Sequence, residues 1–317
     1  MRFLVGLGLA LASACAAAQG YPTRPVKMLV GFTPGGGTDI MARFLAPRLQ
    51  EYLGQPFVVE NRPGATTNVA TEIVAKSAPD GYTLLFTTSA LAINASLYKN
   101  LKYDALKDLA PISVLSESPN MLVAGPALKA ASVQELVAYA RANPGRLNYS
   151  TAGAGTTQHL AGETFKIRTK TFIVHIPYRG TAPSLAAVIA GETEFSFANI
   201  PAILAHVKSG RLRALAVAGA KRSALMPDVP TMKEAGVSGV EVPVWYALLA
   251  PAGTPKEIVD TLAKAAIRAA HSQELAPRLV ADGAEPVGNT PEEFAKFLRA
   301  EIGKYAEAVK VSGAKVE

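Results

Sequence analysis

One repeated pattern runs through the sequence from Val26 onward. A short apolar run is followed by a turn that contains Gly, Pro, Asn or Asp, and then by a stretch whose apolar residues have helical spacing. Because strands that alternate with helices of about ten residues are typical of βαβ units, the pattern predicts an α/β protein with largely parallel sheets. The expected strands are 26–32, 57–60, 83–87, 147–151, 172–176, 194–198 and 213–217, and the expected helices lie near 68–77, 132–142, 157–166, 181–190 and 201–208.

The last third of the sequence changes character. A strand-like run at 242–249 ends in a turn rich in Pro and Gly, and three helical patterns then follow one another. The first and the third of these begin with Thr-Pro, which is the N-cap and first-turn signature of a helix start. Such helices can cover a sheet that earlier strands have made. They are expected at 257–270, 273–282 and 291–309.

This change of pattern indicates two lobes. We expect lobe 1 to comprise residues 21–122 together with 243–317, and lobe 2 to be the continuous segment 123–242. The chain then crosses between the lobes twice, and a largely parallel sheet lies in each lobe. Ligands of open α/β sheets bind outside the carboxyl ends of the strands, so a cleft between the lobes is the expected site.

The N-terminus has the three zones of a secretory signal peptide. Arg2 precedes an apolar stretch from Phe3 to Ala12, small residues continue to Ala18, and the stretch is too short for a membrane span. We therefore expect residues 1–18 to be a cleaved leader rather than a retained anchor. Lipid attachment at Cys15 is the less favoured alternative, because the three residues before it lack the aliphatic side chain that such a site usually has.

Charge and cysteine content narrow the possible partners. The sequence holds 32 basic and 25 acidic residues, a net charge of +7, without the dense Lys/Arg run of a nucleic-acid footprint. This mild positive field favours anionic small molecules. A single cysteine excludes a disulfide framework and a cysteine-based zinc site.

Three loops at strand ends carry the informative chemistry. Residues 31–39 place three glycines before a helix, residues 150–158 combine glycines with hydroxyls before another helix, and residues 87–90 are rich in hydroxyls. Glycine lets a backbone approach a ligand closely, and a helix N-terminus offers unpaired amides, so an anion can bind there without a cationic side chain. Asp39 lies in the first helical turn, where a structural cap is the plainer interpretation.

Other classes of site receive little support. The glycine loops lack the third glycine of the dinucleotide pattern and the Gly-Lys-Ser/Thr of a phosphate loop. The four histidines show no metal-ligand spacing, and no Gly-x-Ser-x-Gly motif is present. We therefore expect no cofactor, no metal site and no catalytic residues. An exported esterase or lyase that acts through hydroxyls of the cleft stays open as the alternative.

Several blocks of sequence occur in an order that is far more specific than any single motif. They are Tyr21-Pro22-Thr23-Arg24-Pro25-Val26, Gly36-Gly37-Thr38-Asp39, Val59-Glu60-Asn61-Arg62-Pro63-Gly64-Ala65, Pro79-Asp80-Gly81-Tyr82-Thr83-Leu84, Pro177-Tyr178-Arg179-Gly180, and Trp245-Tyr246 before Ala250-Pro251-Ala252-Gly253-Thr254-Pro255. With these blocks the chain resembles, over essentially its whole mature length, the Bug (TctC-like) family of periplasmic solute-binding proteins associated with tripartite tricarboxylate transport. The resemblance implies two α/β lobes that close on a small carboxylate, which backbone amides and hydroxyls of the two glycine loops hold.

The resemblance also implies which residues contact the ligand. Ala198 stands where the family often has an acidic residue, so no evident counter-charge awaits an ammonium group. We therefore expect simple carboxylates to bind better than amino acids. The implied ligand-binding residues are Phe32, Gly35, Gly36, Gly37, Thr38, Asp39, Ser89, Gly155, Thr156, Thr157 and Asn199.

Together these observations predict a periplasmic solute-binding protein with a two-lobed fold. It is expected to be a monomer that captures a small organic carboxylate by closure of the lobes. The partners implied by the resemblance are inner-membrane subunits of a tripartite tricarboxylate transporter, or a sensor, and neither nucleic acid nor a membrane span is expected.

Overall fold

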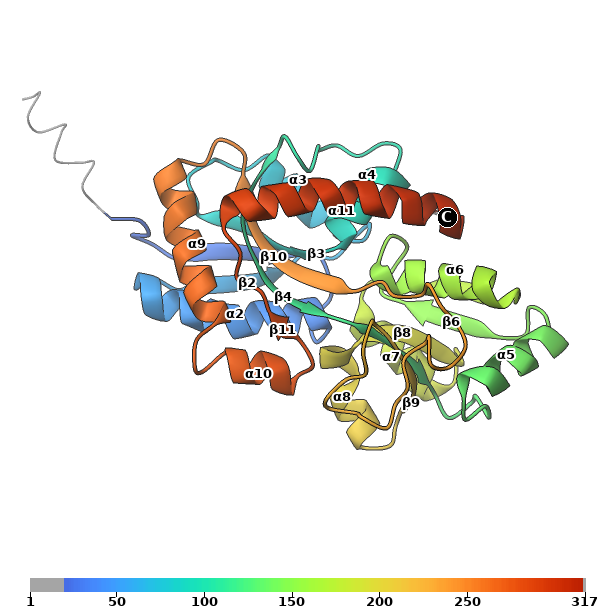
Figure 1. Ribbon diagram of the computed structural model, residues 1–317. Helices are drawn as coiled ribbons and strands as arrows, with labels where there is room; N and C mark the ends of the chain where they lie inside the picture. The colour runs from blue at the N-terminus through green and yellow to red at the C-terminus, as the bar shows by residue number, and fades with distance from the viewer. Residues whose placement is uncertain (1–19, 316–317) are drawn as a thin grey trace, which may run out of the picture.

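The computed structural model describes residues 20–315. The predicted leader and Cys15 lie outside the described residues. Two separate sheets, each flanked by helices, form two lobes (Figure 1). Within residues 20–315 we find no helix with the length and apolar character needed to cross a bilayer.

The first sheet has six strands in the order β11-β4-β10-β3-β1-β2. Strand β1 pairs in parallel with β2 and β3, whereas β10 is antiparallel to β3 and β4. Its strands are β1 (Val26–Val30), β2 (Phe57–Asn61), β3 (Thr83–Thr88), β4 (Leu109–Ser118), β10 (Val244–Pro251) and β11 (Glu285–Pro286).

The second sheet has five strands in the order β7-β6-β8-β5-β9. Strand β6 pairs in parallel with β7 and β8, and β5 is antiparallel to β8 and β9. Its strands are β5 (Asn120–Ala124), β6 (Asn148–Thr151), β7 (Val174–Pro177), β8 (Phe195–Asn199) and β9 (Arg213–Ala218).

Both sheets are therefore mixed, which corrects the expectation of largely parallel sheets, while the two-lobed α/β class is as expected. The chain enters the second sheet with β5 and returns to the first with β10. The first residue of β5, Asn120, pairs with Asn199 at the end of β8, and Tyr246 near the start of β10 pairs with Thr88 at the end of β3. An entering strand begins at the cleft side, where its neighbours end, so it must run antiparallel to them.

Helices cover both faces of each sheet, and several lie where their caps predict. Helix α11 begins at Pro291 after a capping box between Thr290 and Glu293, as the Thr-Pro signal indicated. In the first lobe lie α2 (Gly37–Leu53), α3 (Asn68–Ala75), α4 (Ala90–Leu97), α9 (Lys256–Ala270), α10 (Ala276–Ala281) and α11 (Pro291–Ser312). In the second lobe lie α5 (Val133–Ala142), α6 (Thr157–Thr169), α7 (Thr181–Ala190) and α8 (Ile200–Lys208).

The apolar core continues across the connection between the lobes. One buried cluster contains Leu29 of β1 and Trp245 of β10 together with Leu122 of β5 and Tyr149 of β6. Only Pro119 separates β4 from β5, so the crossing is short and its strands are buried. The exact lobe limits at 122/123 and 242/243 stay predictions.

Candidate functional site

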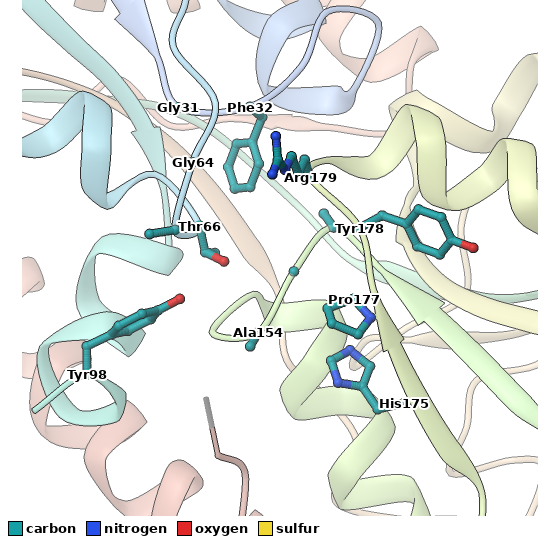
Figure 2. Close-up of a pocket in the computed structure, with 13 residues that line it drawn as sticks. Gly31, Phe32, Gly64, Thr66, Tyr98, Ala154, His175, Pro177, Tyr178 and Arg179 are labelled. Carbon is teal, nitrogen blue, oxygen red and sulfur yellow. The ribbon is translucent and has the colours of Figure 1, made fainter. Parts of the chain in front are cut away.

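A cavity of about 460 Å³ lies between the lobes, at the carboxyl ends of strands from both sheets (Figure 2). The first lobe contributes the residues after β1, the loop after β2 and the residue after α4, and the second contributes the loop after β6, strand β7 and the residues that follow it. This is the position at which open α/β sheets hold ligands. The lining residues are Gly31, Phe32, Gly64, Ala65, Thr66, Tyr98, Ala152, Gly153, Ala154, His175, Pro177, Tyr178 and Arg179.

The loop before α3 forms one wall and has an unusual backbone. Ala65, Thr66 and Thr67 have φ values of 42°, 48° and 72°, so three consecutive residues with side chains occupy the left-handed region. Each such residue costs on the order of 1 kcal/mol or more, and such strain persists only where the surroundings hold it. Here Asn94 Nδ2 donates to the carbonyl oxygen of Thr66 at 2.7 Å and to Asn68 Oδ1 at 2.9 Å. The network thereby fixes Thr66 at the cavity wall.

The opposite wall, from the second lobe, approaches this loop closely. A β-carbon on Gly153 would lie 2.7 Å from Thr66 Oγ1, and one on Gly155 would overlap the side chain of Asn94. Both glycines have positive φ, 129° and 87°. Their missing side chains let the loop after β6 pack against the first lobe.

His175 is one of two aromatic residues, with Tyr178, that the second lobe adds to the cavity lining. Its ring stacks on His159 at a centroid distance of 4.3 Å and on Tyr149 at 4.9 Å, and its Nε2 lies 2.7 Å from Thr151 Oγ1. Burial, followed by the charges of His159 and Lys166, lowers the pKa of His175 to about 3. The imidazole is therefore uncharged near neutral pH.

The first predicted glycine loop, residues 31–39, leads into α2. Its glycine-rich part lies beside the cavity and against the second lobe. A β-carbon on Gly37 would overlap the amide group of Asn199, and one on Gly36 would touch Thr181 at 3.6 Å. Gly36, Gly37 and Thr38 are buried, whereas Gly35 is exposed. In this structure the first glycine loop thus contacts the starts of α7 and α8.

Asp39 has partners within its own lobe. Its carboxylate accepts hydrogen bonds from the backbone of Gly35, from Arg43 Nε and from Asn61 Nδ2, each at 3.0 Å. Burial alone would raise the pKa of this carboxyl, but the hydrogen bonds from Arg43, Gly35 and Asn61 outweigh it and lower the pKa. These contacts agree with the interpretation of Asp39 as a structural cap.

The predicted hydroxyls of the second and third loops also have structural partners. Thr156 Oγ1 accepts from the backbone of His159 at 3.2 Å and caps α6. Thr157 Oγ1 accepts from Asn120 Nδ2 at 2.9 Å. Ser89 is completely buried, and its Oγ accepts from the backbone of Trp245 at 2.9 Å.

Asn199, the remaining predicted polar residue, caps α8. Its Oδ1 accepts from the backbone of Ala202 at 3.3 Å, and its side chain is buried against Gly37. Among the predicted residues, Phe32 lines the cavity. Ligand contact by the others stays a prediction.

Sequence reasoning did not anticipate Thr66, Tyr98 or His175 as cavity residues. The first directly follows the block that ends at Ala65, and the other two carry no local motif. Their signal is their position, after β2 for Thr66, after α4 for Tyr98 and on β7 for His175, which becomes visible only when both lobes are in place. In the described part of the chain we find no group of three His, Cys, Asp or Glu residues that could hold a metal ion.

The two-lobed fold with an interlobe cavity defines a solute-binding protein of the periplasmic type. Residues 41–313 match the family model described as the tripartite tricarboxylate transporter family receptor. The chain belongs to this family, called TctC, which confirms the resemblance seen in its sequence.

Relatives and solved structures agree with this membership. Protein BugT of Bordetella pertussis is 40% identical over 100% of this chain and 99% of its own length. A structure from R. palustris with adipate is 37% identical, with a TM-score of 0.91, and the match covers 94% of this chain and 100% of that one. MatC from Rhodopseudomonas palustris with bound malate is 31% identical, with a TM-score of 0.87, and the match covers 91% and 100%.

The alternative of an esterase or lyase gains no support. The family and these structural neighbours are ligand-binding receptors. Thr151 and His175 bring a hydroxyl next to an imidazole, but Thr151 is completely buried and the low pKa of His175 makes it a weak base.

Proposed function

We propose that this protein captures a small organic carboxylate between its lobes and delivers it to a membrane transporter or a sensor. The observation that carries the proposal is the interlobe cavity, to which both lobes contribute, in a chain of the TctC family. The adipate and malate of the related structures are both carboxylates, which supports the ligand class.

The chemistry of the surrounding helix ends suits an anion. The N-caps of α2 and α7 are Gly36 and Gly180, which offer no side-chain cap, so the first-turn amides of these helices keep the partial positive charge of a helix N-terminus. Arg179, which is exposed at the cavity, adds one full positive charge. We expect these groups to hold the carboxylate.

Closure of the lobes is the proposed mechanism. A ligand that contacts both walls binds the closed arrangement more tightly than an open one, and this difference in affinity shifts the population. The close approach of Gly153 to Thr66, and of Gly37 to Asn199, supports a closed arrangement in which the walls meet around the cavity.

The proposed place of action is the periplasm, after removal of residues 1–18. The expected partners are membrane subunits of a tripartite tricarboxylate transporter, and the protein is expected to be a monomer without a cofactor. Family membership supports the transport role. A sensor that recognises the closed form is the second expected recipient.

Mass spectrometry of the ligand that co-purifies with the native protein tests the proposal directly. We expect a small carboxylic acid that is released on denaturation, and calorimetry should then show that the same acid rebinds to the emptied protein. Recovery of a ligand without a carboxyl group would overturn the proposed ligand class. Steady hydrolysis of carboxylate esters by the purified protein would favour the enzymatic alternative instead.

A further inference from the structure

The cavity between the lobes is uneven in charge. Among the described residues that line it, Arg179 is the only one with a permanent charge. Figure 2 shows Phe32 and Arg179 at one end and Tyr98 and His175 toward the other, with Ala154 between the last two. A bound acid therefore meets a charged end and an uncharged polar end.

The uncharged end, which we call the neutral pole, consists of Thr66, Tyr98 and His175. Figure 2 shows the hydroxyls of Thr66 and Tyr98 pointing toward the same space from the first lobe. The Tyr98 backbone donates to the carbonyl oxygen of Asn94 at 3.0 Å, and Asn94 also holds the Thr66 loop. The side chain of Asn94 thus holds the backbone at Thr66, and its carbonyl oxygen holds the backbone at Tyr98, so one residue positions both parts of the pole in the first lobe.

His175 belongs to this pole because its surroundings keep it neutral. Protonation would place a charged ring 4.3 Å from the ring of His159, and His159 is itself buried. The hydrogen bond between Thr151 and Nε2 of His175 fixes the ring orientation. His175 therefore offers a neutral donor or acceptor rather than a cation.

A carboxylate placed at the neutral pole would lose hydration without gaining an opposite charge. Moving an unpaired ion out of water is far more costly than moving a hydroxyl that finds hydrogen-bond partners. A hydroxyl or carbonyl group can exchange its water contacts for Tyr98, Thr66 or His175 at little net cost.

We propose that the cavity takes a carboxylate whose far end carries an uncharged hydrogen-bonding group, and that the neutral pole selects this group against a second carboxylate. The inference rests on the proposed function, since it assumes that a carboxylate occupies the charged end. It narrows the ligand to hydroxy or oxo monocarboxylates, whereas the adipate and malate of the related structures are dicarboxylates.

Calorimetry with matched acids tests the preference. The pairs are 4-hydroxybutanoate against succinate and 6-hydroxyhexanoate against adipate, which differ only in the far group. We expect the hydroxy acid of at least one pair to bind the emptied protein about tenfold more tightly than its partner. Equal or tighter binding of the dicarboxylate in every pair that binds would overturn the inference while leaving the proposed function intact.

Variants at Tyr98 connect the preference to the neutral pole. Tyr98→Phe removes one hydroxyl and should weaken binding of the hydroxy acid about fivefold, with the dicarboxylate unchanged. Tyr98→Lys adds a cation and should shift the preference toward the dicarboxylate. Tyr139→Phe, an exposed tyrosine on α5 outside the cavity lining, is the matched control and should change neither affinity.

The remaining outcomes are also decisive. An unchanged preference in both Tyr98 variants, when thermal unfolding shows that they fold, would exclude Tyr98 from the pole and overturn the assignment. No measurable heat with any member of either pair, together with a co-purifying ligand that has no carboxyl group, would overturn the proposed function and the inference with it.

Discussion

Individual glycines act in this molecule mainly by letting the lobes approach one another. Gly37 lies against Asn199, Gly155 against Asn94, and Gly153 against Thr66, each pair joining opposite lobes. A β-carbon at any of these positions would push the walls apart. Glycine was expected at these loops because it exposes backbone amides to a ligand. In the structure, the missing side chains also allow the two lobes to pack closely.

Gly37→Ala should therefore weaken ligand binding more than Arg179→Ala. The added methyl group overlaps the Asn199 side chain in the closed arrangement, whereas Arg179 is exposed and contributes through a screened charge. We expect a loss of about tenfold or more in calorimetric affinity for Gly37→Ala. Gly303→Ala is the control, because Gly303 lies on α11 with open space around it. A larger loss for Arg179→Ala would contradict this prediction.

The buried histidines predict a dependence of stability on pH. Burial, against the opposing influence of Glu163, lowers the pKa of His159 from 6.5 to about 4. In the unfolded chain His159 therefore takes up a proton as pH falls below about 6.5, whereas in the folded protein it stays neutral until pH approaches 4. Because the unfolded state binds more protons over this range, His159 lowers the unfolding free energy as pH falls from about 6.5 toward 4. The loss from His159 is on the order of 3 kcal/mol.

Chemical denaturation at pH 7, 5.5 and 4.5 measures this effect. His159→Gln should flatten the decline in unfolding free energy relative to the wild type. His271→Gln, at an exposed histidine, is the control and should leave the decline as it is. A wild-type unfolding free energy that stays constant over this range would contradict the assignment.

At the scale of elements, the loop between β2 and α3 shows how one segment depends on another. Its three left-handed residues receive support from α4, through the hydrogen bonds of Asn94 to Thr66 and Asn68. Tyr103 Oη also donates to Asn68 Oδ1 at 2.6 Å. The cavity wall is therefore held by a helix that does not itself form the loop.

Asn94→Ala should release this loop. The substitution leaves the Thr66 carbonyl without its donor and removes one of the two donors to Asn68 Oδ1, which costs about 1–3 kcal/mol of unfolding free energy. Ligand affinity should fall as well, because Thr66 is no longer fixed at the wall. Asn100→Ala, at an exposed position just beyond α4, should change neither quantity. Wild-type affinity and stability in Asn94→Ala would show that the loop holds itself.

At the scale of the whole molecule, the lobes also contact one another outside the cavity, through a shared apolar cluster and through helices. Helix α11 of the first lobe packs against α6 of the second. Lys221 and Glu285 form an ion pair of 2.7 Å across the lobes, but both side chains are largely exposed, so solvent screens the pair and it adds little. A ligand that contacts both walls is expected to add to these contacts and so to favour the closed arrangement.

Small-angle scattering should detect this closure. Saturation with a ligand whose binding calorimetry has verified should make the particle more compact, because hinge closure shortens the overall dimensions. Scattering from protein with a non-binding acid of the same charge is the control. An unchanged radius at verified saturation would count against closing lobes.

Local sequence signals were sufficient for the elements that short runs of neighbouring residues mark. The strands of β1 and β8, the Thr-Pro start of α11 and the alternation of strands with helices were all readable, because each depends on residues a few positions apart. The blocks of family sequence added the two-lobed class and its receptor role, which the comparisons confirm.

Only the tertiary structure decided the strand directions and the composition of the cavity. Strands β4 and β5 were missed, and β5 and β10 run antiparallel because the chain crosses between the lobes there, a fact that no local period contains. Likewise, Tyr98 and His175 are 77 positions apart in the sequence and come together at the cavity through the packing of two lobes. Periodicity reports which residues are buried, whereas the pairing of distant surfaces depends on the path of the whole chain.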